Sequence, residues 1–199
     1  MAIKVTSLTE QEISEIGEAF AYYNYAEGEY GMSALYKSKE DVKKYICGYA
    51  RAMLKAGFLY STSEEHEAFI AFKSSKESLG FGAVSELIKA VIRTMRFRDM
   101  IKLVKLAKKG ESYEDSLKKA KKPYVFVGML VVRRKYQGQG YMRKVLDIAY
   151  EEGKKLGCPV LLDTDAALKR DKYVHLGMKN VRTRKFDEGI VLYDLAKED

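Results

Sequence analysis

Hydrophobic positions in the first quarter of the chain recur at helical spacing. After a short strand-like opening at Ile3–Ser7, Thr9 precedes apolar residues that lie three and four positions apart, which predicts an amphipathic helix. The apolar face of this helix consists of Ile13, Ile16, Ala19, Phe20 and Tyr23. A second helix is predicted to start near Ser38, to run to Lys55 and to be closed by Gly57.

The next quarter predicts two short strands and one long helix. Phe58–Ser61 and Glu67–Lys73 are expected to form strands around a turn at Ser63–Glu65. Gly82–Lys109 predicts an amphipathic helix with a break near Arg98–Asp99. Its first apolar stripe is Val84, Leu87, Ile88, Val91, Ile92 and Met95, and its cationic side is Arg93, Arg96, Lys102, Lys105, Lys108 and Lys109. We interpret it as a core-packing helix with a solvated basic face; a membrane-surface or substrate-lid helix is the alternative.

Strands and helices alternate in the C-terminal part of the chain. Glu111–Lys122 is polar and predicts a short helix or a loop. The elements expected after it are the buried strand Tyr124–Val132, the turn Arg133–Gly140, the helix Tyr141–Leu156, the strand Val160–Thr164, the helix Ala166–Leu176 and the strands Val181–Phe186 and Ile190–Ala196. This β-α-β-α-β-β order is typical of α/β organisation.

Length and composition favour one domain in a reducing compartment. The 199 residues suit a single domain, 1–199, which we divide into N-terminal helices and first strands (1–79), a basic helical insertion (80–122) and a C-terminal part (123–199). No apolar run approaches the roughly 20 residues of a membrane span, and the first residues do not resemble a secretory signal. Cys47 and Cys158 are too few and too far apart for a disulfide framework or a metal site. We therefore expect a cytoplasmic protein without a metal.

The charge balance indicates an anionic partner without naming it. Lysine and arginine total 36 and aspartate and glutamate 28, which gives a formal net charge of +8. Such an excess fits nucleic acid, a membrane surface or an anionic small ligand. Composition alone does not choose among these three.

A glycine-containing turn between a buried strand and a helix is a candidate anion site. The first N–H groups of a helix have no intrahelical partner, and Gly138 and Gly140 remove side chains that would keep a phosphate away from them. Glycine at such a turn can equally serve geometry alone. The loop lacks the Gly-Lys-Ser/Thr of nucleoside-triphosphate loops and the three glycines of the dinucleotide fingerprint.

Three motifs in order resemble one family. Leu130–Gly140, Leu-Val-Val-Arg-Arg-Lys-Tyr-Gln-Gly-Gln-Gly, resembles the acetyl-CoA motif of the GNAT N-acyltransferase superfamily. Pro159–Thr164 and Tyr173–Met178 resemble the Leu-Glu-Thr strand and the Tyr-Glu-x-Leu-Gly-Phe segment of the branch that includes puromycin N-acetyltransferase. The resemblance covers roughly Tyr124–Leu195. It implies a central mixed β-sheet flanked by helices, and transfer of an acetyl group from acetyl-CoA, a co-substrate, to an amine.

The same resemblance implies roles for individual residues. The backbone of Leu130, Val131 and Val132 would pair with the pantetheine arm, and the amide of Val132 would stabilise the oxyanion. Tyr173 would protonate the leaving thiolate. The pyrophosphate would be held by the amides of Gln137, Gly138, Gln139, Gly140, Tyr141 and Met142.

Several residues depart from that branch. Lys169 stands where the branch has an asparagine that contacts the pantetheine arm, and a lysine could reach a phosphate instead. Lys172 replaces an aromatic residue, Met178 a phenylalanine and Asp163 a glutamate. The glycine loop and the tyrosine are unaffected by these changes.

The acceptor side of the site stays open at this stage. The family resemblance places acceptor binding in N-terminal helices and loops, here Tyr22–Tyr36. His66 could act as a base but is interpreted as a solvated residue of a polar turn, and His175 is interpreted as packing or polar filler. We expect a small-molecule or peptide amine, no specific nucleic acid, and a monomer or homodimer. The alternatives are a non-catalytic acyl-CoA-binding or sensor protein and a basic membrane- or nucleic-acid-surface protein. The candidate general bases are Glu27, Glu29, Glu65, Glu67 and Asp163.

Overall fold

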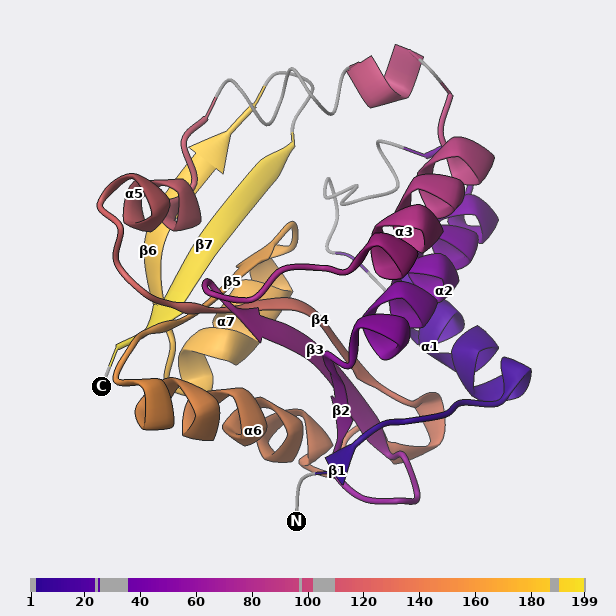
Figure 1. The fold of residues 1–199 in the computed structure, drawn as a ribbon, viewed down its shortest axis with the longest axis horizontal. Coiled ribbons are helices and arrows are strands. Elements are labelled where there is room, and N and C mark those ends of the chain that lie inside the picture. Colours follow the sequence, from indigo (N-terminus) through magenta and orange to yellow (C-terminus); the bar gives the residue numbers. More distant parts are fainter. Residues whose placement is uncertain are drawn as a thin grey trace.

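The protein is built on a seven-stranded mixed sheet (Figure 1). The computed structural model describes residues 3–23, 25, 36–96, 98–101, 110–186 and 190–198. The strand order is β1-β2-β3-β4-β5-β7-β6, and only the β4–β5 pair is parallel among the strands described. The strands are β1 Ile3–Lys4, β2 Leu59–Ser61, β3 Ala68–Ser74, β4 Val125–Val132, β5 Val160–Thr164, β6 Lys179–Lys185 and β7 Val191–Lys197.

Helices cover both faces of the sheet. The N-terminal helices α1, α2 and α3 pack on one face, and α6 and α7 on the other, which confirms the predicted mixed α/β class (Figure 1). A single turn of 3-10 helix, η2 (Arg134–Tyr136), follows β4. The helices are α1 Glu10–Ala21, α2 Lys39–Ala56, α3 Phe81–Thr94, α5 Tyr113–Lys119, α6 Tyr141–Leu156 and α7 Ala167–His175.

The helix boundaries follow from residues that satisfy the ends of each helix. Thr9 forms a capping box with Glu12 at the start of α1, and the Ser38 hydroxyl accepts a hydrogen bond from the amide of Asp41. Gly57 ends α2 in the left-handed conformation with φ of 73°. The predicted limits of these two helices are confirmed to within two residues, and those of α6 and β5 agree with the prediction at both ends.

The predicted helix over Gly82–Lys109 is broken, as expected, but the break comes a few residues before Arg98, and half of the predicted apolar stripe is exposed. Residues 98–101 are helical again after the break. Helix α3 ends at Thr94, because Met95 turns to an extended backbone with ψ of 143°. Of the predicted stripe, Leu87, Val91 and Met95 pack against the core. Ala83 and Ala90 are also buried, whereas Ile88 and Ile92 are 52% and 65% exposed. The small residues face inward because α2 approaches closely: a Cβ on Gly48 would overlap that of Ala90. The cationic residues beyond 101 lie outside the described residues.

Smaller differences concern the edges of the sheet. Strand β1 is two residues long rather than five, and Glu111–Lys122 contains the helix α5, which begins at a capping box of Ser112 and Asp115. The predicted turn at residues 187–189 and the greater part of Tyr22–Tyr36 lie outside the described residues. Cys47 and Cys158 are buried free thiols.

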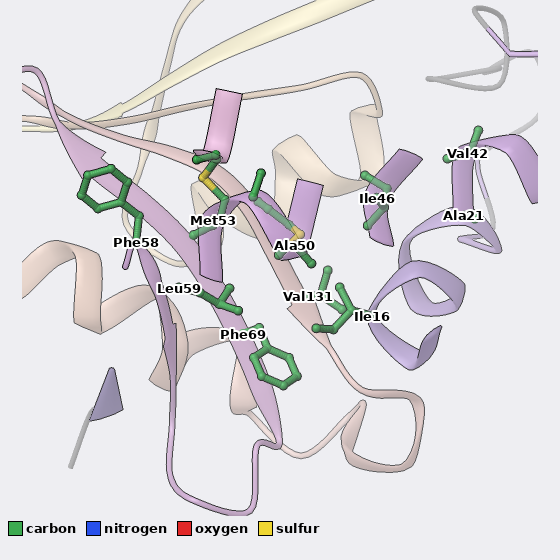
Figure 2. Packing of buried hydrophobic residues seen from close by; sticks show 14 of the residues in the cluster. Ile16, Ala21, Val42, Ile46, Ala50, Met53, Phe58, Leu59, Phe69 and Val131 are labelled. Atoms are coloured by element: carbon green, nitrogen blue, oxygen red, sulfur yellow. The ribbon is translucent and has the colours of Figure 1, made fainter. Parts of the chain in front are cut away.

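A β-bulge at Gly128 changes which face each β4 residue points to. Ala71 pairs with Met129 and Phe72 with Val127, so Gly128 is an extra residue between them. Val127 consequently packs on the α6 side, while Met129 and Val131 pack on the α1–α2 side. Figure 2 shows the second of these cores, where Val131 of β4 meets Ile16 of α1 beside Phe69 of β3.

Candidate active site

Strands β4 and β5 separate after a short contact. Their described lengths, eight and five residues, are joined through just two pairs, Val125–Val160 and Phe126–Leu161. Beyond these pairs β4 follows β3, whereas β5 follows β7. The sheet therefore contains a gap bordered by the second half of β4 and the end of β5.

The backbone of β4 presents polar groups to this gap. The amide of Arg133 donates to the carbonyl of Glu67 at 3.0 Å, which makes this a hydrogen-bonded pair of the antiparallel ladder. Hydrogen-bonded and non-hydrogen-bonded pairs alternate along such a ladder. Val132 and Leu130 therefore direct their N–H and C=O groups away from β3 and into the gap, while the amide of Val131 faces β3.

The loop that follows β4 leaves open space around its glycines. Gly138 and Gly140 have φ of 77° and 79°, a conformation that other residues rarely adopt. A Cβ at either position would meet no atom within 4 Å. Gly140 caps α6 without a side-chain hydrogen bond, and the first turn of α6 contains no acidic residue. The free N–H groups and the dipole of α6 thus face a space that suits an anion.

Glutamine side chains brace this loop from within. The Gln137 amide donates to the carbonyl of Val132 at 3.1 Å, and the Gln139 amide donates to the carbonyl of Lys135 at 2.9 Å. The rings of Tyr136 and Tyr141 lie 5.6 Å apart at the base of the loop. These contacts hold the loop in one shape without filling the space beside its glycines.

A cavity of about 540 Å³ joins the gap to the loop. It receives residues from both faces of the sheet, since Ala19 and Phe20 come from α1 and Tyr173 from α7. Of the predicted site residues, the cavity is lined by Leu130, Val131, Val132, Gln137, Gly138, Gly140, Tyr141, Met142, Lys169 and Tyr173. Gln139 turns its amide back to Lys135 and does not line the cavity.

Tyr173 lies at the cavity wall on the α6–α7 side. It is 8% exposed and packs in the core that contains Leu162 and Val127. Burial, and after it the neighbouring Tyr150, raises the pKa of the Tyr173 phenol well above its usual range. The hydroxyl is therefore protonated at neutral pH and can act as a proton donor.

Lys169 has an environment of aromatic rings. Its Nζ lies 4.7 Å from the ring centre of Phe20, 4.3 Å from that of Tyr23 and 5.1 Å from that of Tyr25. Asp165 Oδ1 is 3.8 Å from the same ammonium. The contacts described for Lys169 are thus with Asp165 and with rings of α1 and of the chain after α1.

Asp163 belongs to a chain of charges across three strands. Arg184 of β6 donates to Asp194 Oδ1 at 2.6 and 2.9 Å and to Asp163 Oδ2 at 3.4 Å. Asp163 and Asp194 are direct partners in the β5–β7 ladder, so their carboxylates share one face of the sheet. The protein around the cavity leaves the Asp163 carboxylate poorly hydrated even where its surface is accessible, and this raises its pKa to about 6, against the effect of Arg184 and with that of Asp194.

The other predicted bases and histidines lie elsewhere. Glu67 accepts hydrogen bonds from Thr62 and Ser63 in the β2–β3 turn, and these hold the pKa of its carboxyl below the usual value despite burial. His66 was expected to be solvated but pairs with Glu12 at 2.7 Å. His175, interpreted as packing or polar filler, is exposed, which agrees with the second interpretation.

Glu27 and Glu29 lie outside the described residues. Among the candidate bases within the described chain, the cavity receives Asp163 alone. The sequence offered no signal for this, since the groups around Asp163 come from distant segments.

Comparison with known families agrees with this geometry. Residues 6–176 match the family described as "Acetyltransferase (GNAT) family". Because the match spans most of the 199 residues, the chain belongs to this family. It is accordingly an acyltransferase of the GNAT class.

Solved structures show the same fold. Arylalkylamine N-acetyltransferase 2 from Aedes aegypti is 12% identical, with a TM-score of 0.59 over 100% of this chain and 98% of that chain. The NatC complex bound to Gag peptide and CoA gives 12% identity and a TM-score of 0.51 over the same shares.

A structure from Agrobacterium tumefaciens is 27% identical, but the match covers only 38% of this chain and 57% of that chain, at a TM-score of 0.35. Among curated proteins, no sequence matches the chain significantly. Within the described residues, the helices are all too short or too polar to cross a membrane.

Proposed function

We propose that the protein is an acetyl-CoA-dependent N-acetyltransferase in which the amine attacks the thioester directly. The observation that carries the proposal is the gap between β4 and β5, which opens beside a helix N-terminus whose glycine loop leaves space for an anion. An extended arm can lie in the gap as an additional strand while its diphosphate lies at the loop.

The residues present fit coenzyme A. The amides of the loop from Gln137 to Met142 would hold the pyrophosphate, and the amide and carbonyl of Leu130 would pair with the pantetheine arm. The amide of Val132 would donate to the thioester oxygen as negative charge develops on it. Basic residues of the loop and of the first turns of α6 supply further positive charge, namely Arg134, Lys135, Arg143 and Lys144.

Tyr173 would supply the proton that the departing thiolate takes up. Its burial keeps the phenol protonated across the neutral range, and its position on α7 places it at the wall of the cavity. A phenol is a suitable donor because a thiolate is basic enough to accept its proton when the two atoms are within hydrogen-bond distance.

The relatives support an amine acceptor without naming it. The similar structures include an arylalkylamine N-acetyltransferase and the NatC complex bound to Gag peptide and CoA. The motif around Tyr173 favours the branch that includes puromycin N-acetyltransferase. We propose a small-molecule or peptide amine as the acceptor and the cytoplasm as the location.

Two measurements test this proposal. Calorimetry with coenzyme A should show binding to the wild-type protein, and acetyl-CoA consumption should depend on an added amine. In Tyr173→Phe, turnover should fall by about 10²-fold or more while the affinity for coenzyme A changes little. Binding of coenzyme A with no turnover of any amine would favour the non-catalytic sensor, and absence of binding would refute both.

A further inference from the structure

The cavity brings together side chains from opposite faces of the sheet, Tyr173 from one face and Asp163 from the other. Successive residues of a strand point to opposite faces. Leu162 packs with Tyr173 in the core on the α6–α7 side, so Asp163 points to the α1–α2 side. Its side chain keeps 45% of its surface accessible because it faces the cavity.

Asp163 also retains much of its negative charge for a ligand. Arg184 makes its two short contacts with Asp194 and reaches Asp163 only at 3.4 Å. The backbone amide of Tyr113 further fixes Asp194 at 2.8 Å. The arginine is thereby committed to Asp194, which is 4% exposed, and Asp163 shares a cation that is mostly neutralised by another carboxylate.

The remaining charged groups near Asp163 do not remove this surplus. Glu114 of α5 and Asp165, just beyond β5, add negative charge, and the Tyr49 phenol of α2 stays neutral because burial raises its pKa. The cavity cations on α7 have other partners: Lys169 lies beside Asp165, and Lys172 Nζ lies 5.5 Å from the ring centre of Tyr23.

We propose that Asp163 binds the ammonium group of a cationic primary amine on the α1–α2 side of the gap and removes its first proton. This rests on the proposed function and names its acceptor class and its base. Phe20 and Tyr23 line the same cavity, and the body of the amine can lie against the parts of these rings that Lys169 does not cover.

The protons balance in the resulting reaction. Asp163 takes one proton from the ammonium and later releases it to solvent. The neutral amine forms a C–N bond to the acetyl carbonyl carbon, the C–S bond breaks, and Tyr173 gives its proton to the sulfur. The second proton of the amine then restores the Tyr173 phenol. The products are the amide, the free thiol and one proton.

The raised pKa of Asp163 fits this role. A value of about 6 leaves the carboxylate ionised at neutral pH yet makes it a stronger base than an ordinary aspartate. For an amine that is cationic throughout, kcat/KM should rise as the pH increases through about 6 and the carboxyl loses its proton.

The test uses pairs of amines that have the same shape but differ in charge. 2-Phenylethylamine and ethylamine are ammonium ions at neutral pH, whereas O-benzylhydroxylamine and methoxyamine, in which an oxygen replaces a methylene, are neutral. In Asp163→Asn, kcat/KM should fall by about 100-fold for the ammonium probes and by less than about threefold for the neutral probes. The limb of the pH profile near 6 should disappear for the ammonium probes.

The control is Asp171→Asn, which removes the same charge a short distance further along the sequence but outside the cavity. Its carboxylate is 61% exposed and pairs with Arg170, so neither class of probe should be affected. Coenzyme A binding, measured on every variant, reports folding and tests the proposed function separately. An equal loss for both classes, no loss for either, or a wild-type protein that binds coenzyme A but acetylates neither ammonium probe would overturn the assignment.

Discussion

Strand β4 contains one glycine in a crowded place and leads to two glycines in an open one. Gly128 lies in the bulge, and a Cβ there would overlap the hydroxyl of Tyr49. Gly138 and Gly140 lie in the loop, and a Cβ there would touch nothing within 4 Å. The first glycine is required by the packing of the protein itself. Gly138 and Gly140 are required by their positive φ angles, and no atom of the described residues fills the space beside them.

The difference separates stability from binding. Changes at Gly128 should disturb the path of β4 and therefore the free energy of unfolding. Changes at the loop should leave the core intact and act on whatever occupies the open space. Substitutions at the two places can test this division directly.

The largest effect is expected from Gly140→Asp. The new carboxylate would lie at the N-terminus of α6, where it repels a pyrophosphate, so we expect coenzyme A to bind about 100-fold more weakly. Aspartate tolerates the left-handed conformation better than most residues, but φ of 79° still strains it, so the melting temperature should fall modestly, as in the matched control below. Calorimetry and thermal unfolding measure the two quantities.

Gly157→Asp is the matched control for that substitution. Gly157 also has a positive φ, 61°, and open space around it, but it lies at the opposite end of α6. The variant should lose some stability, because a negative charge is unfavourable at a helix C-terminus, and should keep its affinity for coenzyme A. Equal loss of affinity in both variants would show that the loop is not the binding site.

Gly128→Ala should affect stability more than binding. The methyl group would force Tyr49 to move within a packed region, at a cost of about 1–3 kcal/mol of unfolding free energy. Tyr49→Phe, which removes the overlapping hydroxyl, should recover part of that loss in the double variant. Chemical denaturation measures both effects, and a fully stable Gly128→Ala protein would contradict the packing role of this glycine.

The smallest effect concerns the end of β4 between the two glycine regions. Arg133 Nε donates to Glu15 of α1 at 2.7 Å, and this contact, more than any other, holds the pKa of Glu15 below its usual value. A lowered pKa in the folded state means that the contact stabilises the protein above the unfolded pKa, near 4.5, and is lost as the pH falls below it.

Glu15→Gln should therefore cost only about 1 kcal/mol of unfolding free energy at neutral pH, because solvent screens part of the charge on Glu15. The cost should be smaller in acid, where the Glu15 carboxylate itself takes up a proton. Melting temperatures of the two proteins should converge as the pH is lowered below 4.5. A constant difference across the whole range would mean that packing, and not the ion pair, carries the contribution of Glu15.

Helices whose ends are marked by neighbouring residues could be predicted from the sequence. The buried face of a helix that packs against a distant segment could not. Gly157 and the polar loop before Tyr141 define α6 within the chain itself, and the prediction of its limits is confirmed. The orientation of α3 depends on how closely α2 can approach it. Periodicity placed Ile88 and Ile92 on one buried stripe with Leu87 and Val91. Only the latter two pack against the core, because the close contact with Gly48 requires the small residue Ala90 on the buried face.

The candidate site also has one part that the sequence predicts and one part that it does not. The glycine loop is visible in the sequence because strand, turn and helix are contiguous. Asp163 could be named only as one of five carboxylates, because its surroundings depend on Arg184, Asp194 and Tyr113, which reach it through sheet pairing and through α5. Sequence spacing carries no information about which of these groups shares a face.

The gap between β4 and β5 has a consequence for the order of events in turnover. Since its lining comes from both faces of the sheet, donor and acceptor can be held together, with no need for an acetylated protein intermediate. Initial rates at varied concentrations of both substrates should then give intersecting double-reciprocal plots. A conjugate that joins coenzyme A to an amine through one linker should act as a bisubstrate inhibitor, competitive against each reactant.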